Sequence, residues 1–87
     1  MTMYYEFNTS DGIKYCIYNN DGEYPMKEYK TNEPCYVYNQ YGEEYLMYPE
    51  NNTKYIIGKY DESISYNYRR LTEEEFYEKV GKNKKMK

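Results

Sequence analysis

The sequence predicts a mainly β domain: a strongly bent antiparallel sheet, or a small open barrel, of about five to seven strands with one short C-terminal helix. Three observations predict it. Apolar and polar residues alternate along short segments, and turn residues separate these segments roughly every eight to twelve positions. Tyrosine makes up 16 of the 87 residues. Its ring buries roughly 150–250 Å² while its hydroxyl stays hydrogen-bonded, so tyrosine can build a thin core between strands.

The turn residues set the expected order of strands. Gly12 and Gly22, each preceded by an aspartate, are typical of tight hairpin turns, and Gly42 marks a weaker one. Pro25 lies inside the third segment, which predicts an irregular strand or an edge strand there. We place strands near residues 3–8, 13–18, 23–29, 35–39, 43–48, 54–60 and 63–69.

A weak internal repeat, about one hairpin long, predicts which side chains face the core. A register error of one residue would invert any strand. Because Cys16 and Cys35 are assigned to opposite faces, and because we expect a reducing compartment, we predict free thiols and no disulfide. The predicted inward residues are Met3, Tyr5, Phe7, Ile13, Tyr15, Ile17, Cys35, Val37, Tyr55, Ile57, Ile64, Tyr66 and Tyr68, and the outward residues are Cys16, Tyr18, Tyr36 and Tyr38.

The C-terminal part has the pattern of a helix. Thr72 and Glu75 have the spacing of a capping box, in which each side chain bonds the other residue's backbone. Phe76 and Val80 form one apolar stripe, and Gly81 is a stop signal. We therefore expect a single domain over residues 1–81, with the helix near 73–80, and a basic disordered tail over 82–87.

Composition argues against several functional classes. The chain has no histidine, which excludes Ser-His and Cys-His catalytic pairs and histidine metal sites. Carboxylates are plentiful, so a paired-carboxylate glycosidase is not excluded by composition. We nevertheless expect no enzyme, no catalytic residue, no metal and no cofactor. No apolar stretch is long enough to span a membrane, and residues 1–6 do not look like a signal peptide, so we expect a cytoplasmic protein.

Charge is segregated along the chain. Residues 1–78 hold 15 acidic and 7 basic side chains, whereas residues 79–87 hold five lysines and no acid. An acidic surface rich in tyrosine suits a basic groove on another protein, where carboxylates stand in for phosphates. The size, the charge and the lack of catalytic pairs resemble small anti-CRISPR and other anti-defence inhibitors of phages and mobile elements. We therefore expect a stoichiometric inhibitor that occupies a basic nucleic-acid-binding surface of a host protein in the host cytoplasm.

The expected contact residues lie at hairpin ends and on the outer face of the strands between residues 13 and 48. For each tyrosine, a cross-strand pair that stabilises the sheet explains the residue equally well. Surface acids that serve only solubility explain the charge equally well. The predicted partner-binding residues are Tyr18, Asp21, Glu23, Tyr36, Tyr38, Tyr41, Glu43, Glu44, Tyr48 and Glu50.

Two other binding functions stay open. Exposed tyrosines can stack single-stranded nucleic acid or a nucleotide, although the acidic charge disfavours a phosphate backbone. The segments YYEFNTSDG and YCIYNNDGEY resemble the choline-binding cell-wall repeats of bacteria, which are aromatic β-hairpins. That resemblance implies a carbohydrate or cell-wall binding module, but the chain lacks the tryptophans around which such repeats build their ligand sites. Exposed sheet edges also leave a homodimer open.

Overall fold

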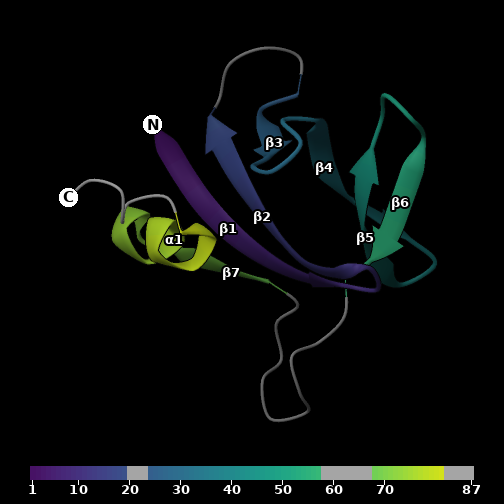
Figure 1. Ribbon diagram of the computed structural model, residues 1–87. Coiled ribbons are helices and arrows are strands. Elements are labelled where there is room, and N and C mark those ends of the chain that lie inside the picture. Colours follow the sequence, from purple (N-terminus) through teal and green to yellow (C-terminus); the bar gives the residue numbers. More distant parts are fainter. Residues whose placement is uncertain (20–23, 58–67, 82–87) are drawn as a thin grey trace, which may run out of the picture.

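The computed structural model describes residues 1–19, 24–57 and 68–81. Seven antiparallel strands form one sheet in the order β6-β5-β4-β3-β2-β1-β7. The sheet is bent and does not close into a barrel within the described residues, which confirms the predicted fold class (Figure 1). The elements are β1 Thr2–Thr9, β2 Gly12–Asn19, β3 Met26–Glu28, β4 Pro34–Gln40, β5 Glu43–Tyr48, β6 Thr53–Ile56, β7 Tyr68–Leu71 and α1 Glu73–Val80.

The bend brings the two ends of the strand order toward each other. In Figure 1, β1 and β2 form one arm of the sheet and β5 and β6 form the other. Where the arms meet, Thr9 forms an isolated antiparallel bridge with Ile57. The backbone N–H of Ser10 also donates to the carbonyl of Ile56 at 2.9 Å. The sheet is therefore an open trough that is pinned at one end.

The turns follow the predicted chemistry where the structure describes them. Gly12 has a φ of 98° after β1, and the β4–β5 turn has φ values of 53° at Tyr41 and 79° at Gly42. Two successive positive φ values are the pattern of a type I′ hairpin turn. The predicted turn at Asp21 and Gly22 lies outside the described residues, as do Ile64, Tyr66 and the basic tail over residues 82–87.

The third strand is short because of its sequence. Pro25 precedes its first residue and cannot donate a ladder hydrogen bond, so β3 contains just Met26–Glu28. Of the two predicted alternatives, the irregular strand is the one observed, since β3 is short and lies between β2 and β4, not at an edge of the sheet. Its pairing with β4 consists of two residue pairs, Met26 with Cys35 and Lys27 with Pro34.

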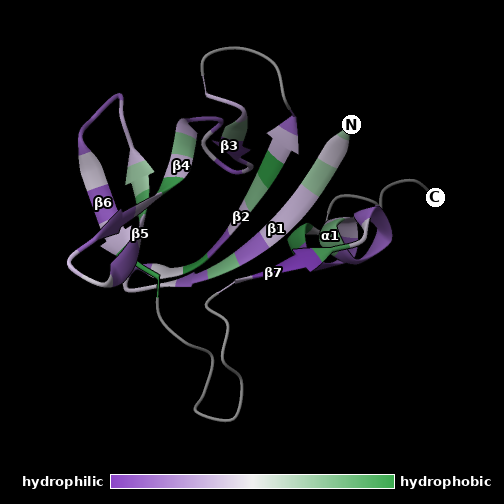
Figure 2. Ribbon diagram, turned by 180° about the vertical axis from the view of Figure 1, so that it is seen from behind, coloured by the Kyte–Doolittle hydropathy of each residue, from purple (hydrophilic) through white to green (hydrophobic). Residues whose placement is uncertain are grey.

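The core lies on the inner, concave face of the sheet. Its buried residues include Phe7, Cys16, Cys35 and Leu46, each at most 1% exposed. Figure 2 shows hydrophobic bands along β1 and β2 that are interrupted by polar ones. Further members of this cluster, or residues packed against it, are Tyr5, Tyr18, Met26, Val37, Tyr48, Tyr55, Ile57 and Tyr68.

The predicted faces are correct for β1, β4 and β6 but inverted for β2. Cys16 is fully buried and Tyr18 packs against the core, although both were expected to face outward. Ile13 was expected to face inward and is 51% exposed. Tyr15 also lies on the other side of the sheet, where its ring contacts Phe76 of the helix. The physical reason is that β2 has large apolar side chains on both faces, so alternation alone does not fix its register.

The C-terminal helix forms as its sequence predicts. The hydroxyl of Thr72 accepts from the backbone N–H of Glu75 at 3.0 Å, and the Glu75 carboxylate accepts from the N–H of Thr72 at 3.1 Å. Gly81 ends the helix in the left-handed conformation. Phe76 is fully buried, with its ring centroid 4.8 Å from that of Tyr4 and 5.3 Å from that of Tyr29. The helix therefore packs on the convex side, over the β1 and β7 end of the sheet.

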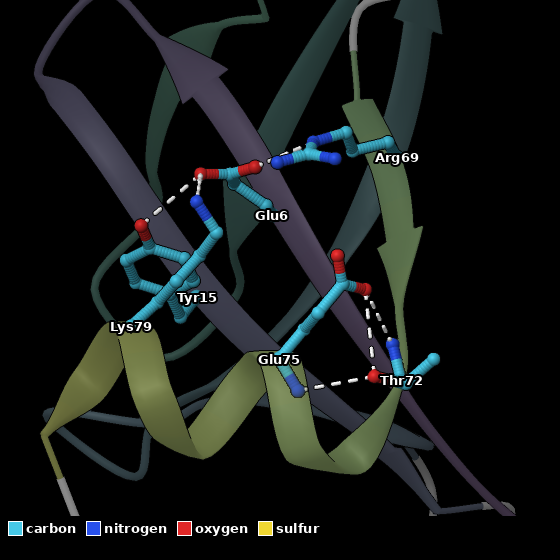
Figure 3. Close-up of polar contacts among 6 residues, drawn as sticks. All are labelled: Glu6, Tyr15, Arg69, Thr72, Glu75 and Lys79. Atoms are coloured by element: carbon cyan, nitrogen blue, oxygen red, sulfur yellow. Dashed lines mark hydrogen bonds and ion pairs between the residues drawn. The ribbon is translucent and has the colours of Figure 1, made fainter.

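One buried carboxylate joins the helix to three strands (Figure 3). Glu6 of β1 is 4% exposed and accepts from Arg69 of β7 at 2.8 Å. Its other oxygen accepts from the Tyr15 hydroxyl at 3.1 Å and lies 3.8 Å from the Lys79 ammonium. Donors from β2, β7 and α1 thus converge on β1.

We expect Phe76→Ala to lower the free energy of unfolding by about 3–5 kcal/mol, because the change opens a cavity between the helix and the sheet. Urea unfolding followed by far-ultraviolet circular dichroism measures the effect. Glu74→Ala is the matched control, since Glu74 is exposed on the same helix; it should change the free energy by less than about 0.5 kcal/mol. Equal losses in both variants would contradict the packing described for Phe76.

Candidate functional site

A row of four tyrosines, which we call the tyrosine row, begins just before β3 and continues along the β4–β5 hairpin: Tyr24, Tyr36, Tyr38 and Tyr45. The rings of Tyr24 and Tyr36 are stacked, with centroids 5.7 Å apart and planes 8° apart. Tyr36 and Tyr38 lie two positions apart on the same face of β4, and their rings meet edge to face with centroids 6.5 Å apart. Tyr45 pairs with Tyr38 across the hairpin, with centroids 6.4 Å apart. The row is therefore continuous from the start of β3 to β5.

The helix does not cover this part of the sheet. Among the described residues, α1 packs against β1 and β7, which lie at the opposite end of the strand order from β4 and β5. Figure 1 shows the helix far from the β4–β6 arm. Tyr36, Tyr38 and Tyr45 are each partly exposed. The row thus presents aromatic area to solvent.

Polar side chains hold the end of the row in place. The Lys54 ammonium lies 5.4 Å from the ring centroid of Tyr38 and 4.9 Å from that of Tyr45, close enough for cation–π attraction. It also donates to the side-chain oxygen of Gln40 at 3.0 Å. The Tyr45 hydroxyl donates to Glu43 at 3.1 Å. These contacts restrict the rotamers of both rings, which lowers the entropy that a binding partner would have to remove.

Four predicted contact residues come together at this hairpin. Tyr36 and Tyr38 belong to the tyrosine row itself. Tyr41 stands in the turn and is 92% exposed. Glu43 begins β5 directly after the turn and is exposed. The hairpin therefore ends in an exposed aromatic ring beside a carboxylate.

Other predicted contact residues lie elsewhere. Tyr48 is 3% exposed and its hydroxyl donates to the buried carboxylate of Glu28 at 2.6 Å, so we withdraw it from the contact surface. Tyr18 packs against the core on the concave face. Glu44 alternates with Glu43 along β5, and its side chain belongs to the concave face. Glu50 follows the far end of β5. Asp21 and Glu23 lie outside the described residues.

The sequence interpretation missed Tyr24, Tyr45 and Lys54. Tyr45 and Lys54 could have been found from the registers of two successive hairpins. A type I′ turn at Tyr41 and Gly42 fixes the register of β4 against β5, which places Tyr45 opposite Tyr38. Lys54 requires the register of the next hairpin, where it pairs with Met47. No comparable local signal connects Tyr24 with Tyr36.

The concave face carries an aromatic hollow of about 240 Å³. Its described lining includes the aromatic residues Tyr5, Phe7, Tyr18, Tyr36 and Tyr68 and contains no charged residue. Tyr36 thus borders both the hollow and the tyrosine row. The other described residues that line the hollow are Pro25, Met26, Cys35 and Val37.

Buried titratable groups lie behind this hollow. The Sγ atoms of Cys16 and Cys35 are 3.8 Å apart, and both thiols are free. The prediction that the two cysteines lie on opposite faces was wrong, since both belong to the core cluster of the concave face. The hydrogen bond between the thiols, together with burial, raises the pKa of Cys16 well above its usual value. Burial and the hydrogen bond to Glu28 strongly raise the pKa of Tyr48.

Within the described ranges, no group of three or more histidine, cysteine, aspartate or glutamate side chains could hold a metal ion. No helix in the described part of the chain is long and apolar enough to cross a membrane. Comparison with protein-family models, with curated proteins and with solved structures finds no match to the chain. The resemblance of the hairpins to choline-binding repeats therefore receives no support from these comparisons.

We expect the free energy of unfolding to fall above about pH 10, the ordinary pKa of tyrosine. Below that pH, Tyr48 is protonated in both states and its contribution is fully present. Above it, the unfolded chain releases the proton while the folded protein retains it, so stability falls by up to about 1.4 kcal/mol per pH unit for this group. The raised pKa values of Tyr4, Tyr15 and Tyr68 act in the same direction.

Urea unfolding at several pH values from about 9 to about 11, on either side of the ordinary tyrosine pKa, tests this expectation. Tyr48→Phe should show a shallower alkaline loss than the unmodified protein. It should also be less stable at neutral pH by about 1–3 kcal/mol, because Glu28 loses its donor. Tyr41→Phe is the matched control, since Tyr41 is exposed, and it should keep the original slope. An unchanged slope in Tyr48→Phe would contradict the assignment.

Proposed function

We propose that the protein is a stoichiometric inhibitor of the kind that phages and mobile elements use against host defence, including anti-CRISPR proteins. It acts in the host cytoplasm and occupies a basic nucleic-acid-binding surface on a host protein. The contact element is the β4–β5 hairpin. The observation that carries the proposal is the end of this hairpin, where Tyr41 is 92% exposed in the turn and Glu43, which begins β5, is also exposed.

Tyrosine suits such a contact. It supplies a large, rigid area with few rotatable bonds, and it is enriched among residues that dominate binding energy. Tyr38 and Tyr45 are already restrained by Lys54, so little side-chain entropy remains to be lost. The row is long enough to serve several anchors along one hairpin.

Charge supports a basic partner more than a nucleic acid. The described residues include 11 acidic and 7 basic side chains. Such a surplus attracts a positively charged groove and steers the encounter, whereas it repels a phosphate backbone. We also propose that the protein is not an enzyme, because the chain has no histidine and both thiols are fully buried.

One observation favours a second candidate, a module that stacks single-stranded nucleic acid or a nucleotide. Lys54 stands over Tyr38 and Tyr45, and Lys27 is exposed on the neighbouring strand β3. Aromatic rings beside cations are the usual platform for bases and their phosphates. The surrounding acidic charge makes this candidate the weaker one.

We expect affinity capture from a lysate of the natural host to retain one host protein in stoichiometric amount after nuclease treatment. The full chain is tagged, and mass spectrometry identifies what is retained. Retention should fall as the salt concentration rises, because at physiological ionic strength salt screens attraction between charges more than about 8 Å apart. Glu43→Lys and Tyr41→Ala should each reduce it at least about tenfold, as for a residue worth more than 1.4 kcal/mol at an interface.

Glu74→Lys is the matched control, because it makes the same charge change on an exposed helix residue far from the hairpin. It should leave capture unchanged. Equal weakening by Glu43→Lys and Glu74→Lys would mean that net charge, not the hairpin, governs binding. Salt-independent capture would contradict the proposed groove.

The second candidate predicts a different result. A fluorescent single-stranded oligonucleotide should bind the purified protein alone, and Tyr38→Ala should weaken that binding by roughly 1–3 kcal/mol. Lys54→Glu should weaken it further, whereas Glu43→Lys should strengthen it. Absence of binding at low salt would remove this candidate and leave the protein-binding proposal standing.

A further inference from the structure

The two cysteines lie on opposite arms of the bent sheet. Cys16 belongs to β2 and Cys35 to β4, and the short strand β3 runs between them. Both are 0% exposed, and their Sγ atoms are 3.8 Å apart across the concave face. A flat sheet would hold strands two positions apart at roughly twice the strand spacing of about 4.8 Å. The contact between the thiols therefore depends on the bend.

The bend occurs where pairing in the sheet is thinnest. β3 and β4 share two residue pairs, whereas β1 and β2 share eight and β4 and β5 share five. One of the two pairs contains Cys35 itself, opposite Met26. The thiols thus straddle the junction between the β1–β2 arm and the β4–β6 arm.

We propose that Cys16 and Cys35 are a redox modification site, at which a small-molecule disulfide oxidises the two thiols to an intramolecular disulfide that locks the bend. A thiolate attacks one sulfur of the oxidant, which forms a mixed disulfide and releases one small thiol. The second cysteine then attacks the protein sulfur and releases the second small thiol. Two protein S–H bonds are lost, one S–S bond forms, and the oxidant is reduced to two thiols.

The geometry needs both side-chain and backbone movement. A disulfide bond is about 2.05 Å long, so the Sγ atoms must approach by roughly 1.8 Å. Because β3 lies between the two cysteine strands and a disulfide usually joins Cα atoms roughly 4.4–6.8 Å apart, the bend must tighten as the side chains rotate. Cys35 lines the aromatic hollow, together with Tyr5, Tyr18 and Tyr68. Because both thiols are 0% exposed, the oxidant reaches them only when the sheet opens locally. Cys35 lies at the lining of the hollow, so we assign the first attack to that residue and the closing step to Cys16.

Two features set the rate and the effect of this reaction. The raised pKa of Cys16 disfavours its thiolate, so closure is slow at neutral pH and accelerates as the pH rises. Once formed, the bond closes a loop between residues 19 positions apart. A loop of that size should raise the melting temperature by on the order of 10 °C, because cross-linking restricts the unfolded chain.

The test exposes the folded full-length protein to hydroxyethyl disulfide, removes the excess and records its intact mass. The expected result is a monomer lighter by two hydrogen atoms, with a peptide map that joins Cys16 to Cys35. The melting temperature should rise, and dithiothreitol should reverse both changes. The rate should increase with pH over the range in which thiols ionise.

Controls make the outcome decisive. The urea-unfolded protein under the same oxidant shows that the reagent is active. Cys16→Ser and Cys35→Ser should each stop at the free thiol or at a mixed disulfide. If the folded protein keeps two free thiols, or collects only mixed disulfides and cross-linked dimers, the proposal is overturned. Because these readouts use the unmodified chain, they hold even if a serine variant fails to fold.

Discussion

One buried carboxylate gathers side chains from the helix and from two strands. Glu6 is almost fully removed from solvent, and a charge in that position is costly unless donors surround it. Arg69, Tyr15 and Lys79 supply them from β7, β2 and α1 (Figure 3). Since these donors come from three elements, the carboxylate links β7, β2 and α1 to β1. The contact therefore specifies one arrangement of strand, strand and helix, in a protein whose aliphatic core is small.

Tyrosine serves two different purposes in this fold. Tyr15 and Tyr48 place their rings in apolar surroundings and donate their hydroxyls to the buried carboxylates of Glu6 and Glu28. Phenylalanine would fill the same space but would leave each carboxylate without that donor. Tyr38 and Tyr45 instead line the outside of the β4–β5 hairpin, where Lys54 stands over both rings. One residue type thus completes the interior and supplies the surface on which the proposed function rests.

Local signals predicted most of the fold from sequence. The helix between Thr72 and Gly81 was predicted to the residue, because caps act over a few neighbouring positions. The register of β2 was wrong because both of its faces are covered, one by the core and one partly by the helix, so no polar face marks its direction. Tyr48 was misplaced on the surface for a related reason. The composition of a tyrosine-rich strand does not reveal which hydroxyl finds a buried partner, since that depends on pairing with distant Glu28.

The placement of β7 has a consequence for the order in which the chain can assemble. β1 lies between β2, which follows it directly, and β7, so Glu6 and its partner Arg69 are 63 positions apart. While the protein is being synthesised, the outer edge of β1 has unpaired backbone groups until β7, residues Tyr68–Leu71, has left the ribosome. Such an edge is a template for pairing with other chains. The C-terminal segment therefore closes the sheet as well as anchoring the helix, and a nascent chain that stalls before residue 68 leaves that edge open.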